Sequence, residues 1–250
     1  MDQSVSIIMY HYVRDLKNSK YPDIKGLDLT LFEEQIMYIK KHYSIISAFD
    51  FIDAIKSGST LPPKSILLTF DDGYSDHYLN VYPILKNHKI SGLFFPPAKS
   101  ITLNQVLDVN KIHFILASID NKHTLIEDIY EKLDTYRSTF NLKKNDYYMR
   151  TLGKKNRFDT AEVIFIKRIL QHALPKSLRE IITNNLFEKY VTKDQASFSK
   201  ELYMSISNII QLQEDGMYVG SHGYEHSWLN HLNCAQQKKE IELSIEFLNT

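Results

Sequence analysis

Residues 65–77 read SILLTFDDGYSDH, and this stretch decides the fold prediction. An apolar run of strand length reaches Phe70, then meets two adjacent carboxylates, Asp71 and Asp72, followed by Gly73. A near-continuous apolar run that ends at a turn is typical of a strand buried in a parallel sheet. Two neighbouring carboxylates at its end repel each other and resist desolvation. Solvent, a turn or a bound cation must therefore make this arrangement favourable.

The segments around this strand alternate between short apolar runs and helical patterns. Residues 5–10 and 91–95 read as further strands, and residues 217–221 as a short one near the end of the chain. Helical patterns begin at residues 30, 47 and 74. Strands that alternate with helices in this way predict a parallel sheet with crossover helices.

From about residue 101 to 215 the sequence shows helical signals and no convincing strand. TLIE at 124, DTAE at 159 and SLRE at 177 each resemble a capping box that begins a helix. The segment is too long for a plain loop. We therefore expect a first α/β part at residues 1–100, a helical insertion at 101–215 and a continuation of the α/β domain at 216–250. That last part ends in a helix with Ile241, Ile245 and Leu248 on one face.

The composition limits the classes of partner. Lys and Arg total 30 of the 250 residues and Asp and Glu also total 30, which argues against nucleic acid or an anionic membrane as the main partner. The single cysteine, Cys234, cannot form an internal disulfide and fits a reducing compartment. The N-terminus lacks a signal-peptide pattern, and no apolar window is long enough for a transmembrane helix. We expect a soluble, cytoplasmic protein whose oligomeric state stays open.

The stretch SHGYEH at residues 221–226 places His222 and His226 four residues apart, which on a helical turn puts both imidazoles on one face. Neutral imidazole is the commonest nitrogen ligand of zinc and similar ions. The carboxyl ends of parallel strands gather at one edge of a sheet, so these histidines and the Asp71–Asp72 pair are expected to converge. Residue types and spacing thus predict a metal hydrolase in which one of the two aspartates, Asp71 or Asp72, is a ligand. The alternative is that the two aspartates only form a turn and the histidines are unrelated to them.

Three stretches resemble signatures of the polysaccharide deacetylases, the NodB-homology or carbohydrate esterase family 4 proteins. LTFDDGY at 68–74 and GSHGYEHSWL at 220–229 are similar to the family motifs T-F-D-D-G and H-[ST]-x-x-H, and IIMYHYV at 7–13 resembles the first strand of bacterial members. The resemblance implies a distorted (β/α) barrel and a hydrolase that removes acetyl groups, mostly N-acetyl, from sugars.

The same resemblance implies roles for individual residues. Asp71 becomes the general base, and Asp72, His222 and His226 become ligands of a divalent metal ion, usually zinc, with cobalt or nickel as alternatives. In that mechanism the ion lowers the pKa of its water, and Asp71 removes a proton from that water. The expected partner is an acetylated carbohydrate whose identity the sequence leaves open.

The sequence departs from the family pattern in three ways. Gly223 stands where the second motif usually has Ser or Thr, so the loop needs another brace. The segment between the motifs is much longer than in most relatives and forms either a lid over the substrate or a structural or oligomerisation insert. No later arginine-proline or Leu-x-His motif follows His226, so the general acid lacks a candidate, and we expect these residues to be the N-terminal part of a longer protein.

Two further residues are candidates for substrate binding. His11 follows the first strand and is expected near the site, in contact with substrate or with the residues around it. Trp228 either stacks on a sugar ring or packs between the loop and the last helix. Two other functions stay open: a hydrolase of the same fold that cleaves non-sugar C–N bonds, and a catalytically incomplete homologue that binds metal or carbohydrate.

Overall fold

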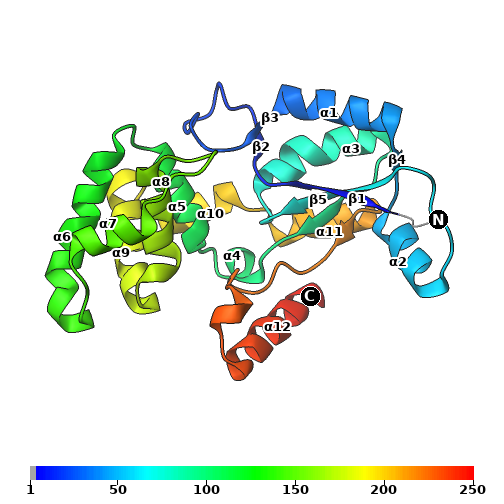
Figure 1. Cartoon of the computed structure of the whole chain (residues 1–250). Helices are drawn as coiled ribbons and strands as arrows, with labels where there is room; N and C mark the ends of the chain where they lie inside the picture. Colours follow the sequence, from blue (N-terminus) through cyan, green and yellow to red (C-terminus); the bar gives the residue numbers. More distant parts are fainter. Residues whose placement is uncertain (1–3) are drawn as a thin grey trace. The chain divides into compact units, whose positions relative to one another are not determined.

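The computed structural model describes residues 4–250, which form a mixed α/β chain with a parallel five-stranded sheet (Figure 1). The sheet has the order β1-β5-β6-β7, and β4 also pairs with β5. All of these pairings are parallel, with Tyr10 opposite Phe70 and Phe70 opposite Phe94. The strands are β1 (Ser6–Tyr10), β4 (Ser44–Ile45), β5 (Ser65–Asp71), β6 (Leu93–Phe95) and β7 (Tyr218–Val219).

The chain divides into two compact units. The first comprises the residues through Ser19, Lys25–Gln105 and Ala196–Thr250, and the second comprises Lys20–Ile24 and Val106–Gln195. The first unit contains the five-stranded sheet and a two-stranded ribbon of β2 (Val13–Arg14) and β3 (Leu27–Asp28). Its helices are α1 (Leu29–His42), α2 (Ala48–Ser57), α3 (Tyr82–His88), α4 (Ala98–Thr102), α10 (Gln195–Leu202), α11 (Ile206–Glu214) and α12 (Cys234–Leu248).

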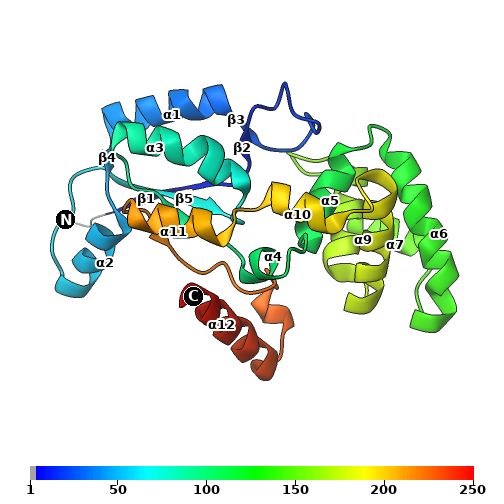
Figure 2. The ribbon, with the colours of Figure 1, turned by 180° about the vertical axis from the view of Figure 1, so that it is seen from behind.

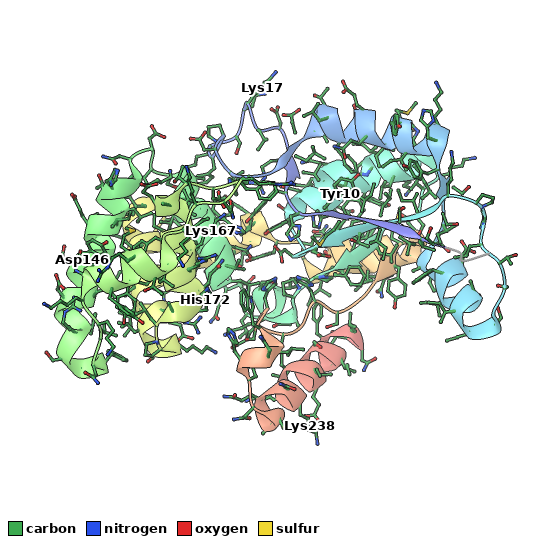
Figure 3. All side chains as sticks on the ribbon, in the orientation of Figure 1. Tyr10, Lys17, Asp146, Lys167, His172 and Lys238 are labelled. Carbon is green, nitrogen blue, oxygen red and sulfur yellow. The ribbon has the colours of Figure 1, made fainter. Side chains whose placement is uncertain are left out.

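An aromatic core fixes the sheet of the first unit. The ring of Phe70 on β5 stacks on Tyr10 of β1 at 5.2 Å and on Phe94 of β6 at 4.9 Å, and Phe32 of α1 meets Tyr10 edge-on. In both ribbon views α1 and α3 lie above the sheet and α11 lies below it (Figures 1 and 2). In Figure 3 the side chain of Tyr10 lies inside this unit, whereas Lys17 and Lys238 project outward. Burial of both faces explains why β5 is apolar along its length until Asp71.

The second unit is entirely helical over residues 106–195 (Figure 1, green to yellow). Its core holds Leu125, Ile129 and Leu133, which share helical spacing, together with Ile166 and Leu170, and all of them are buried. Two expectations stay predictions: that this unit is an insertion into the α/β domain, and that the domain boundaries lie at 100/101 and 215/216. The elements are α5 (Asp108–Ala117), α6 (Lys122–Phe140), α7 (Asn145–Leu152), α8 (Ala161–Arg168), a π-helical turn (Ile169–Ala173) and α9 (Lys176–Tyr190).

The helix starts predicted from capping boxes in this unit were wrong or displaced. Helix α6 begins before the TLIE stretch because the Asn121 side chain accepts the backbone N–H of His123. Helix α8 is capped by Thr160 instead of Asp159, and α9 begins directly after Pro175, so Ser177 lies inside it. A pattern of residue types cannot choose between neighbouring polar side chains that can each accept the same orphan N–H groups.

The final helix buries a face other than its apolar one. Ile241 and Ile245 of α12 are 47% and 50% exposed, whereas Glu240 and Ser244 are buried. The Glu240 carboxylate accepts backbone N–H groups of the loop before the helix, and these bonds compensate its burial. Apolar spacing alone therefore does not identify the buried face of this helix.

The mixed α/β class with a parallel sheet is confirmed. Within residues 4–250 the five strands form an open sheet, and closure into a barrel is not seen. None of the helices in the described part of the chain is long and apolar enough to cross a bilayer.

Candidate metal centre

The ends of two strands bring the predicted ligands together. Asp72 follows β5 directly, and His222 and His226 lie in the loop after β7, two strands away across β6. The Oδ1 atom of Asp72 lies 3.4 Å from Nε2 of His222 and 3.4 Å from Nε2 of His226. One potential ligand atom from each residue lies within 4.8 Å of the others. The predicted convergence of these three residues is thus present in the geometry.

The two histidines reach this position without a helix. Residues 220–228 contain no helical turn, and His226 itself has a left-handed backbone with φ 59°. The expectation of a helical turn is therefore wrong, although the four-residue spacing holds. Asp72 also has a positive φ, 71°. Non-glycine residues rarely adopt this conformation, and such outliers gather at functional sites where the surrounding structure holds them.

Asp72 is an almost fully buried carboxylate, with an exposed fraction of 2%. Its Oδ2 accepts a hydrogen bond of 2.5 Å from the Tyr74 hydroxyl, while its buried Oδ1 has no hydrogen-bond donor. Burial raises the pKa of Asp72, but the neighbouring His222, His226 and Tyr74 outweigh burial and hold that pKa far below its usual range. Conversely, Asp72 raises the pKa of His226. A negative oxygen without a donor, facing two imidazole nitrogens, is a place where a positive charge is favoured.

The donor set fits a divalent cation of the zinc type. One carboxylate oxygen and two imidazole nitrogens form a ligand set that zinc accepts while it keeps an open position. Ligand atoms at about 2.0–2.1 Å from a tetrahedral ion lie about 3.3 Å apart, close to the oxygen–nitrogen separations found here. The orphaned Oδ1 atom is the observation that favours an ion over a turn that is merely polar.

Asp71 lies beside this group and differs from Asp72 in its electrostatics. Burial raises the pKa of Asp71, and the charge of Asp72 adds to that rise, while His222, His11 and His226 oppose it. Two adjacent carboxylates thus have pKa values shifted in opposite directions. Such a pair suits one permanently charged group and one group that takes up a proton.

His11 interacts with Asp71, whereas Trp228 is an exposed ring beside His231. His11 follows β1, its electrostatic interaction reaches Asp71, and its backbone carbonyl accepts a hydrogen bond from the His77 imidazole. Trp228 is 54% exposed, with its ring 5.2 Å from that of His231. Their roles in substrate binding stay predictions.

Two residues of the centre were missed by sequence reasoning. Tyr74 holds Asp72 from within the first motif, and its position directly after Gly73 was the available signal. Glu240 holds the histidine loop from α12, and no sequence pattern pointed to it.

Comparisons with known proteins agree with the first of the two motifs. A family model described as polysaccharide deacetylase matches residues 58–113, which include Asp71 and Asp72. The chain is 30% identical over 91 residues to the poly-beta-1,6-N-acetyl-D-glucosamine N-deacetylase of Escherichia coli (strain K12), an alignment that covers 36% of this chain and 13% of that protein. It is 27% identical over 96 residues to YxkH of Bacillus subtilis (strain 168), whose name assigns it to the polysaccharide deacetylases, covering 38% of this chain and 32% of YxkH.

One solved structure is similar over nearly the whole chain. The Streptococcus pyogenes deacetylase PplD, in complex with acetate, aligns with a TM-score of 0.51 and 14% sequence identity, covering 98% of this chain and 67% of that one. At this identity the likeness concerns the fold alone. The alignments with the two curated relatives span about a third or less of their lengths.

Proposed function

We propose that this chain, as a polysaccharide deacetylase family protein, is a metal-dependent hydrolase. Its proposed reaction is the removal of acetyl groups, chiefly N-acetyl, from a sugar or sugar polymer. The observation that carries the proposal is the convergence of Asp72, His222 and His226 around one orphaned carboxylate oxygen, with Asp71 beside them. The substrate class follows the names of the relatives and is proposed for this chain on that basis.

Asp72, His222 and His226 would hold the divalent ion, with zinc as the first choice and cobalt or nickel as alternatives. A divalent ion held there would supply the positive charge that lowers the pKa of water and polarises the acetyl carbonyl. The Tyr74 hydroxyl holds Oδ2 of Asp72, so that Oδ1 stays directed toward the two imidazoles.

Asp71 is the proposed general base. Its raised pKa makes its carboxylate a better proton acceptor than an ordinary aspartate, and it takes the proton of the attacking water. As the C–N bond breaks, the leaving nitrogen must take up a proton, and in this proposal the protonated Asp71 returns to it the proton that it took from the water. His11 and the exposed ring of Trp228 are proposed to contact the sugar.

In this proposal the open five-stranded sheet is the first part of a distorted (β/α) barrel. The helical unit of residues 106–195 is an insertion that either shapes the substrate cleft or has a structural role. The TM-score to PplD supports the shared fold without distinguishing these two roles.

Metal content and acetate release test the proposal together. The purified chain should bind about one zinc-like ion, measured by elemental analysis, and Asp72→Ala and His226→Ala should lose it. Asp71→Asn is the matched variant: it should retain the ion but lose acetate release from N-acetylglucosamine oligomers by two or more orders of magnitude. Absence of bound metal after incubation with zinc, cobalt or nickel would contradict the site. An intact metal site that releases no acetate from any acetylated sugar would favour a non-sugar substrate or a binding role.

A further inference from the structure

Glu240 is a buried carboxylate that the proposed chemistry does not use. It lies on α12 with only 7% of its surface exposed. Its Oε1 accepts the backbone N–H of Tyr224 at 3.0 Å and that of Glu225 at 2.6 Å. Within residues 4–250 the structure gives it no ion pair with lysine, arginine or histidine. A glutamate is rarely buried without a cationic partner, so these two charge-assisted hydrogen bonds are its main compensation.

Gly223 provides the space for this carboxylate. Its φ is +80°, and a Cβ atom at this position would lie 3.2 Å from Oε1 of Glu240. A side chain here would be strained in backbone conformation and would press against the carboxylate. The glycine that replaces the usual hydroxyl residue of the second motif thus lies against the acidic side chain that holds the loop.

The carbonyl groups of the same loop are fixed by α4. The N–H of Ala98 donates to the Gly223 carbonyl at 3.1 Å, and the N–H of Lys99 donates to the Tyr224 carbonyl at 3.0 Å. The Lys99 ammonium also pairs with the Glu225 carboxylate at 2.5 Å. The loop is therefore held through its carbonyls by α4 and through its N–H groups by Glu240.

His226 follows directly after Tyr224 and Glu225, whose backbone N–H groups Glu240 holds. Its left-handed backbone is one that L-residues rarely adopt, so the surroundings must select it. Without the two hydrogen bonds from Tyr224 and Glu225, the loop can relax toward commoner backbone conformations. The His226 imidazole would then leave the position 3.4 Å from Asp72 that completes the ligand group.

We propose that Glu240 is a positioning residue for the metal centre: Glu240 fixes the backbone of residues 223–226 so that the imidazoles of His222 and His226 both face Asp72. The metal-binding part of this inference rests on the proposed function, whereas its structural part concerns the free protein. Groups outside the ligand set that orient the ligands commonly change metal affinity by about 10–100-fold.

The test compares Glu240→Ala, Glu240→Gln and the control Glu242→Ala. Glu242 is exposed on the same helix and, among the residues that the structure describes, pairs with Lys238 at 3.6 Å. Zinc affinity is measured by competition with a chromogenic chelator, and amide hydrogen exchange of residues 222–227 is measured without metal. We expect Glu240→Ala to bind zinc at least about tenfold more weakly and to lose protection at Tyr224 and Glu225. Glu240→Gln keeps an acceptor oxygen and should lie between the parent and Glu240→Ala, while the control matches the parent.

The two readouts separate this inference from the proposed function. Parent-like exchange and parent-like zinc affinity in Glu240→Ala would overturn the positioning role. A parent that binds neither zinc, cobalt nor nickel would refute the proposed metal site, and the exchange of Tyr224 and Glu225 would still decide the role of Glu240. If Glu240→Ala does not fold, Glu240→Gln decides: faster exchange at these two amides supports the role because the charge of the acceptor is lost, and unchanged exchange overturns it.

Discussion

Replacement of Tyr74 by phenylalanine would isolate one hydrogen bond of the metal centre. Tyr74 is fully buried, and its ring stacks on Tyr12 at 4.0 Å and on Tyr203 at 6.2 Å. Phenylalanine keeps these ring contacts and removes the hydroxyl that donates to Oδ2 of Asp72. Because Asp72 is only 2% exposed, water cannot readily replace the lost donor.

The expected magnitude follows from the charge and burial of the acceptor. A hydrogen bond to a charged group contributes about 1.5–3 kcal/mol, so the free energy of unfolding of the metal-free Tyr74→Phe variant should fall by that amount. With a urea m-value of about 2 kcal/mol/M, the unfolding midpoint should move down by about 1 M. Zinc affinity should also fall by about tenfold or more, because Asp72 is then less firmly oriented.

The assay is urea unfolding in the presence of a chelator, followed by zinc titration of the folded variant. Tyr78→Phe is the matched control, since the Tyr78 ring stacks on Tyr82 away from the ligand group, and it should match the parent in zinc affinity. A Tyr74→Phe variant with the parent's stability and the parent's zinc affinity would refute the account of how Asp72 is held.

Two further predictions concern the core of the sheet unit. Burial lowers the pKa of His77 from 6.5 to about 4, so the unfolded chain takes up a proton before the folded chain does. The free energy of unfolding should therefore fall by at most about 3 kcal/mol as the pH drops from about 6.5 to 4. In urea titrations across that pH range, His77→Gln should show a smaller fall than the parent. Equal dependence of the unfolding free energy on pH in the two proteins would contradict this prediction. Gly92→Ala should destabilise the folded protein by about 1–3 kcal/mol, because the Cβ of the new alanine would lie 2.8 Å from the Leu85 side chain. An unchanged melting temperature would argue against such tight packing.

The sequence by itself determined the strands and the residue types at their ends. The apolar runs that became β5 and β6 are recognisable because a strand buried in a parallel sheet needs apolar side chains along its own length. The run that became β1 is also apolar, although its Ile7 and Met9 are exposed. Asp72 follows β5 directly, and the two histidines lie in the loop after β7. Their convergence follows from the parallel connection of those strands, a rule that local patterns can carry.

Only the tertiary structure decided how the ligands are held. The choice of Asn121 as the cap of α6 and the burial of Glu240 instead of Ile241 on α12 depend on competing polar contacts. Glu240 is buried because it meets N–H groups of a loop sixteen and fifteen residues earlier in the chain. Apolar spacing reports which residues favour burial, but the cost of burying a polar group depends on the partners that the folded chain brings to it.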